Sequence, residues 1–171
     1  MSGRCSAIAD DSAVNDSAQE KIDDLDKEAE HLLEEARMVL PGIQALFGFQ
    51  LIAFFNQRFS ESLSPADQGV HLAALLLAAV SIAFVMAPAA YHRQAEPGRV
   101  SKRFIKVATR LITIGLAPLV IALSLDTYVV SKLVLGDGRS IMPAIVLFVI
   151  LAALWFAWPQ WRRAREPNTR R

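Results

Sequence analysis

Four apolar runs, nearly free of charge, dominate the pattern along the chain and lie near residues 38–55, 70–90, 111–130 and 141–158. A helix rises about 1.5 Å per residue, so each run is long enough to cross the roughly 30 Å hydrocarbon core of a membrane. Helices are favoured over strands because lipid cannot satisfy backbone amides, and barrel strands would alternate polar and apolar residues. The pattern predicts an all-α membrane protein with a bundle of four transmembrane helices.

A different pattern precedes the first run. Residues 1–16 are small and polar and predict a disordered acidic tail. Ser17-Ala-Gln-Glu20 is a capping-box sequence that predicts a helix start, and we expect an amphipathic cytoplasmic helix over 17–36. Its apolar residues recur at steps of three and four: Ile22, Leu25, Ala29, Leu32, Ala36 and Val39. This stripe fits either a short coiled coil or a helix packed on the protein's own cytoplasmic face.

Charge is strongly segregated although the whole chain is nearly neutral. The composition is 53% hydrophobic, with a mean hydropathy of +0.32. Residues 1–36 hold three basic and eleven acidic side chains, whereas basic residues gather in the loop after the second run and in the tail at 162–171. Basic residues beside membrane ends are retained in the cytoplasm, so we expect both termini of the membrane domain (37–161) to be cytoplasmic.

Two segments resemble a known family. They are "LPGIQALFGFQLIAFFNQRF" at 40–59 and "APAAYHR" at 87–93. Both are similar to a family of bacterial four-helix membrane proteins known only as domain of unknown function 6328, and the likeness covers roughly residues 33–131. The resemblance implies a small multi-pass protein of the bacterial inner membrane with a cytoplasmic loop after Tyr91-His92-Arg93, and it supplies no activity. The positions that carry it include Gln44, Gln50, Gln57, Arg58, Pro88, Tyr91, His92 and Arg93.

The first apolar run keeps two glutamines. On a helical wheel one stripe joins Arg37, Pro41, Gln44, Gly48, Leu51, Phe55 and Arg58. We expect this stripe to be the bundle face, with Gln44 hydrogen-bonded to a neighbouring helix because an unpaired amide in lipid is costly. Gln50 points away from it, toward a second helix contact or a subunit interface. A packing seam is the favoured interpretation, and a polar pathway is the alternative.

The third run carries a second polar line. Arg110, Thr113, Ala117, Ser124 and Tyr128 share a narrow sector of the wheel. Arg110 lies close enough to the cytoplasmic end to extend its guanidinium to the interface. Asp126 is the single acid within an apolar run and lies nearly opposite Arg110, so it is a candidate for proton or cation handling, or is simply hydrated near the outer end.

Tyr91, His92 and Arg93 close the second run. A histidine and an arginine there could bind a lipid headgroup phosphate, although anchoring at the interface is the favoured interpretation. The three histidines are far apart in sequence and have no acid or cysteine at ligand spacing, so we predict neither a metal site nor a cofactor. The basic tail is explained by topology and membrane lipids, and we expect no nucleic-acid partner.

No catalytic motif is recognisable, so the sequence predicts a class of protein rather than an activity. The first hypothesis is a non-enzymatic structural or accessory component that self-associates through its helices. The second is a subunit of a small ion or solute channel or transporter, built from Gln44, Gln50, Arg110, Thr113 and Asp126. A third is a lipid-active membrane enzyme using His92 and Arg93.

Overall fold

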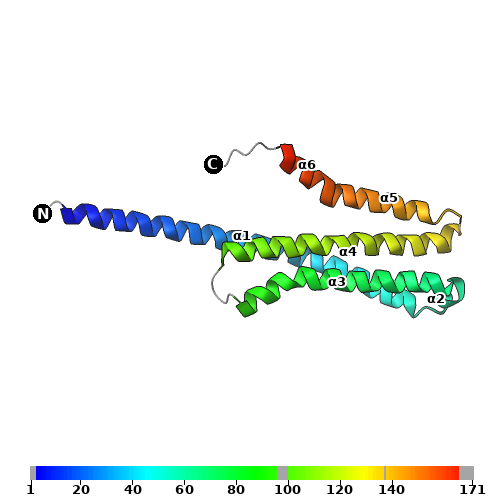
Figure 1. The fold of residues 1–171 in the computed structure, drawn as a ribbon. Helices are drawn as coiled ribbons and strands as arrows, with labels where there is room; N and C mark the ends of the chain where they lie inside the picture. Colours follow the sequence, from blue (N-terminus) through cyan, green and yellow to red (C-terminus); the bar gives the residue numbers. More distant parts are fainter. Residues whose placement is uncertain (1–2, 96–99, 137, 166–171) are drawn as a thin grey trace.

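The computed structural model describes residues 3–95, 100–136 and 138–165, which form long helices joined by short connections (Figure 1). Their order is α1 (Gly3–Phe54), α2 (Gln57–Ser62), α3 (Pro65–Ala95), α4 (Lys102–Leu135), α5 (Ile141–Ala152), the π-helical turn η1 (Ala153–Ala157) and α6 (Trp158–Arg165). Four helical segments are long and apolar enough to span a membrane: Gln19–Phe54, Pro65–Gln94, Lys102–Leu135 and Ile141–Arg165. The prediction of an all-α fold with four membrane-spanning helices is confirmed.

One continuous helix, α1, takes in the predicted amphipathic helix, the first span and most of the predicted tail. The described helix begins at Gly3, where the sequence predicted a disordered tail over 1–16. No proline occurs before Pro41, so nothing in the covalent structure interrupts the helix over that distance. Ala29 is buried and packs with Phe104, Ile105 and Ala108 at the start of α4. The N-terminal part of α1 extends beyond the bundle (Figure 1).

The bundle face of α1 is a correction to the sequence analysis. Ala29, Ile43 and Gln50 are buried and recur at multiples of seven residues, so they share one side of the helix. Gln44, predicted to face inward, is exposed, because the residue after Ile43 lies about 100° further round the helix. Most of the predicted stripe is exposed with it, and the side chain of Arg58 lies outside the described residues.

Helices α3 and α4 make the closest contact in the fold. Ala74, Ala78 and Ala122 are fully buried. At the crossing, the Ser81 hydroxyl donates to the carbonyl oxygen of Gly115 at 2.8 Å, and a Cβ added at Gly115 would lie 2.9 Å from the Cβ of Phe84. Small residues and a side-chain hydrogen bond are what hold helices together in lipid, where apolar burial gives little advantage.

The fourth span is attached differently. Helix α5 packs on α4, with Ala144 as its one buried residue, and the described residues of η1 and α6 include none that is buried. Figure 1 shows α6 diverging from α4. The N-terminal part of α1, the end of α3, the start of α4 and α6 lie at one end of the bundle, while α2, the end of α4 and the start of α5 lie at the other. The loop residues 96–99 and the tail residues 166–171 lie outside the described residues.

Candidate functional site: a buried polar triad

Helix α3 begins with a capping arrangement that places an acid at the α2 end of the bundle. Ser64 precedes Pro65, whose missing N–H is tolerated in the first turn. The Asp67 amide donates to the Ser64 hydroxyl oxygen at 3.3 Å, and that hydroxyl donates to the Asp67 carboxylate. The local sequence therefore fixes both the start of α3 and the position of the Asp67 carboxylate.

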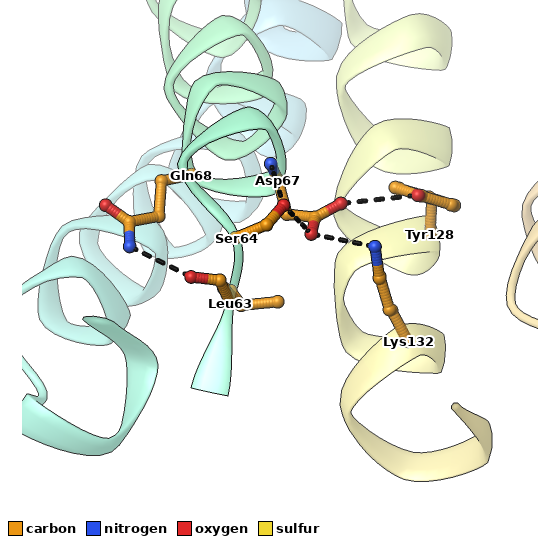
Figure 2. Close-up of polar contacts among 6 residues, drawn as sticks. All are labelled: Leu63, Ser64, Asp67, Gln68, Tyr128 and Lys132. Atoms are coloured by element: carbon orange, nitrogen blue, oxygen red, sulfur yellow. Dashed lines mark hydrogen bonds and ion pairs between the residues drawn. The ribbon is translucent and has the colours of Figure 1, made fainter. Parts of the chain in front are cut away.

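Two side chains of α4 reach the same carboxylate (Figure 2). The Lys132 ammonium lies 2.8 Å from Asp67 Oδ2, and the Tyr128 hydroxyl donates to Oδ1 at 3.3 Å. Asp67 is buried, so these partners replace the water that the charge would otherwise require. We call Ser64, Asp67, Tyr128 and Lys132 the end cluster, which ties the start of α3 to the last turns of α4.

A second polar group lies one turn further along α3 and joins three helices. Gln50 comes from α1, His71 from α3 and Asp126 from α4; we call them the buried triad. The Gln50 amide nitrogen donates to Asp126 Oδ2, and His71 Nδ1 lies 3.2 Å from Asp126 Oδ1. The other ring nitrogen, His71 Nε2, lies 3.0 Å from the backbone carbonyl oxygen of Gln50. Gln50 and His71 are each 4% exposed, so little water reaches them.

The two ring nitrogens of His71 face two different oxygens. A carbonyl oxygen can only accept, so Nε2 carries a proton when it bonds to Gln50. A proton placed between Nδ1 and the Asp126 carboxyl group would belong either to the imidazole or to the carboxylic acid. Both arrangements leave His71 and Asp126 together without net charge. The geometry therefore suits one proton held between the two side chains.

Apolar residues enclose this end of the bundle. The Phe59 ring lies 4.7 Å from the His71 ring, centroid to centroid. Phe59, Leu63 and Val129 form a buried cluster with Tyr128 packed against it. Asp67 and His71 are four residues apart, so the end cluster and the triad are separated by about 6 Å along α3. The short helix α2 thus contributes an aromatic side chain directly beside the imidazole.

The structure brings together only some of the residues predicted from sequence. Gln50 and Asp126 meet in the triad, whereas Gln44 is exposed. Sequence reasoning missed His71, which it considered only as a metal ligand. The available signal was that His71 and Asp126 are the ionisable side chains within the second and third apolar runs, and such residues in spans usually pair with one another.

Arg110 and Thr113 are exposed on a different side of α4. They line a groove of about 620 Å³ between α4 and the η1–α6 segment. The Thr113 hydroxyl donates to the carbonyl oxygen of Thr109 at 2.8 Å, a bond within the same helix. Because α4 separates this groove from the triad, the five predicted pathway residues do not form one site.

The Tyr91, His92 and Arg93 cluster lies at the end of the bundle opposite α2. The Tyr91 ring stacks on Phe104 with a centroid distance of 6.0 Å, and the His92 ring lies 5.2 Å from the same side chain. His92 and Arg93 also line a cavity of about 240 Å³ together with Arg37 from α1. These contacts fit an anchoring role, and the neighbouring arginines fit an anionic group. Within the described part of the chain, no cluster of three or more His, Cys, Asp or Glu side chains could hold a metal ion.

Four long apolar helices joined by short connections define a multi-pass helical membrane protein. The chain belongs to a family of unknown function (DUF6328), whose profile matches residues 16–159, so the family resemblance seen in the sequence is confirmed. No curated protein and no solved structure matches the chain.

Proposed function

We propose that this protein is a non-enzymatic subunit of an ion or solute pathway in the membrane, and that the buried triad binds and releases a proton as part of that pathway. The observation that carries the proposal is the environment of His71, whose two ring nitrogens both face oxygen acceptors on other helices. An intramembrane acid paired with a histidine is the combination that proton relays use.

The energetics favour coupling between proton binding and helix movement. In a medium of low dielectric constant the electrically neutral pair is favoured, and adding or removing one proton leaves an uncompensated charge. That charge is stabilised only if water or a counter-ion enters, or if the helices separate. Since the triad joins α1, α3 and α4, a change in its proton count acts on all three helices at once.

The end cluster offers the nearest route to the triad. Tyr128, Asp67 and Lys132 supply a hydroxyl, a carboxylate and an ammonium group about one helical turn from His71. A water-mediated step across this distance would connect the two groups. We propose that protons enter from the α2 end.

A structural or accessory role is the second candidate function, and one observation favours it. The triad and the end cluster together give most of their buried polar atoms a partner, which is what a clamp between helices requires. In that case the polar groups fix the register of the helices, and the exposed apolar faces of α5 would serve self-association.

Proton flux into vesicles discriminates between the two functions. The protein is reconstituted into liposomes containing a trapped pH dye, and an acid pulse is applied outside. We expect Asp126→Asn and His71→Gln to reduce protein-dependent flux at least tenfold while the helical content is retained. Gln44→Leu is the matched control, since this amide is exposed on the same span, and it should leave the flux unchanged. Flux that is identical in all variants, with a lower unfolding free energy for Asp126→Asn, would instead support the structural role.

We also propose that the protein resides in the bacterial inner membrane with both termini in the cytoplasm. The basic residues beside the membrane support this orientation. Cys5 is the single cysteine of the chain and provides a direct test. A membrane-impermeant maleimide should label Cys5 in inverted vesicles and not in intact spheroplasts. Labelling of intact spheroplasts would contradict the orientation.

A further inference from the structure

The groove between α4 and the η1–α6 segment has a polar end and an apolar floor. Its volume is about 620 Å³. Its lining residues come from α1, α4, η1 and α6, and Figure 1 shows α6 and the N-terminal part of α1 at the same end of the bundle. Its lining combines basic, polar and apolar side chains.

The charge of the lining is predominantly positive. Lys106 and Arg110 project from successive turns of α4, and Arg163 faces them from α6, whereas Glu28 is the one acid among the lining residues. Among the residues that the structure describes, the ion pairs involve other side chains, and these three cations have none. All three are exposed. Unpaired guanidinium and ammonium groups converging on one groove favour an anionic ligand, and phosphate oxygens suit the fork of arginine.

The fourth span, which forms the other wall of the groove, contains the π-helical turn η1 (Ala153–Ala157) beside the groove. The Trp158 amide donates to the carbonyl oxygen of Ala153, a spacing of five residues that marks a π turn. Pro159, which follows, has no N–H to offer the Trp155 carbonyl. Trp155 and Phe156 from this turn form part of the groove floor. Single π turns in α-helices occur frequently at binding sites.

A second, more apolar hollow lies further along α4, between α4 and α5. It has a volume of about 420 Å³ and is lined mainly by apolar side chains, among them Ile121, Leu125 and Phe148. Arg110 and Ile121 are eleven residues apart, which corresponds to about 16 Å along α4. One leaflet of the hydrocarbon core is about 15 Å thick. The distance from the basic groove to the apolar hollow thus matches the depth that one acyl chain reaches.

We propose that this groove is a binding site for an anionic phospholipid. The phosphate group lies between Arg110, Arg163 and Lys106, and one acyl chain follows α4 past Leu116 toward the apolar hollow. A soluble phosphate compound would use only the basic end, so the apolar floor of the groove and the apolar hollow further along α4 favour a lipid. The bound lipid would fill the groove where the η1–α6 segment diverges from α4. The site is separate from the triad and does not depend on proton exchange.

Quenching of Trp155 fluorescence by brominated lipid tests the site. The full chain carries Trp158→Phe and Trp161→Phe, so that Trp155 alone reports, and is placed in phosphatidylcholine nanodiscs with increasing phosphatidylglycerol brominated in its acyl chain. We expect saturable quenching, with the half-saturating fraction raised at least tenfold by Arg110→Gln with Arg163→Gln. The matched control is Arg103→Gln with Arg162→Gln, which removes the same charge from the same two helices outside the groove and should shift half-saturation less than threefold.

A second pair of variants tests the acyl chain contact without changing charge. Thr113→Phe should weaken quenching at least threefold by narrowing the groove, whereas Ile114→Phe, next to it and outside the groove, should not. Equal effects of the two arginine pairs would reduce the site to diffuse surface attraction and overturn the proposal. Quenching by brominated phosphatidylcholine at the same fractions, or displacement by soluble glycerol phosphate, would overturn it as well.

Discussion

The core formed by α1, α3 and α4 and the separate fourth span show two ways of holding a helix in a membrane. In the most apolar stretch of α4, 33% of residues are buried within the protein, against 6% in the fourth span. The core buries polar side chains from all three helices in the triad, whereas α5 offers the single buried residue Ala144. The mean hydropathy of the most apolar stretch is 2.5 in the fourth span and 1.9 in α4, so the more apolar helix is the one that leaves more of its surface to lipid.

The comparison indicates where the stability of the protein lies. Lipid tails are as apolar as leucine, so helices gain little by burying apolar surface against one another. Close backbone approach and hydrogen bonds between helices supply the difference, and these are concentrated in the core at Gly115, the triad and the end cluster. The fourth span shares more of its surface with lipid.

The largest expected effect comes from filling the close crossing of α3 and α4. Gly115→Leu should lower the free energy of unfolding by about 3 kcal/mol, because even a Cβ would lie 2.9 Å from the Cβ of Phe84. Circular dichroism during denaturation in mixed micelles measures the change. Gly42→Leu is the control, since no atom lies within 4 Å of a Cβ there. Equal losses in both variants would show that the close crossing at Gly115 is not what sets the stability.

The triad should give the next largest effect. His71→Leu removes the partner of a buried carboxyl group and should cost about 2 kcal/mol of unfolding free energy. In a double-mutant cycle with Asp126→Leu, we expect a coupling energy of about 1 to 2 kcal/mol, near the upper range for side-chain hydrogen bonds in membranes. A coupling energy near zero would mean that the 3.2 Å contact contributes nothing to the core.

The end cluster should contribute less because its lysine is partly hydrated. The Lys132 side chain is 23% exposed, whereas Asp67 is 5% exposed, so Lys132→Met should cost about 1 kcal/mol of unfolding free energy. Arg139→Met, an exposed cation at the same end of the bundle, should change the same measurement by less than about 0.3 kcal/mol. If the two substitutions lower the unfolding free energy equally, the net positive charge at this end of the bundle sets the effect, and the contact between Lys132 and Asp67 does not.

The fourth span should be the least sensitive. Leu154→Ala, at a side chain that is 50% exposed, should change the unfolding free energy by less than about 0.5 kcal/mol. Leu119→Ala in the core, where the side chain is 5% exposed, should cost about 2 kcal/mol in the same assay. Similar losses at both positions would remove the distinction between core and fourth span.

Much of the fold followed from sequence, whereas the rotation of each helix did not. The apolar runs predicted the membrane-spanning helices because the thickness of the hydrocarbon core sets the length of such a helix. Their rotation was misjudged at Gln44 because an apolar face can meet either lipid or another helix, so hydropathy does not separate the two. The bundle face of α1 was marked instead by the seven-residue spacing of Ala29, Ile43 and Gln50.

The polar contacts were also only partly predictable. Asp126 was recognised as exceptional because a carboxyl group within a membrane span is costly. Its partners, His71 among them, lie 55 or more residues away in the sequence and belong to other helices. Pairing of that kind depends on the crossing geometry of α3 and α4. The length of α1 was missed because a polar segment with no breaking residue can be either helical or disordered by composition alone.

The proton shared by His71 and Asp126 is the central claim, and its most direct test is the nitrogen resonances of the His71 imidazole in lipid bilayers. His31→Gln and His92→Gln leave His71 as the one histidine for ¹⁵N solid-state spectroscopy. We predict two nitrogens that are protonated or in strong hydrogen bonds, with the Nδ1 resonance displaced by Asp126→Asn. An unprotonated Nδ1 that accepts no hydrogen bond, with the same resonance in the Asp126→Asn variant, would contradict the account.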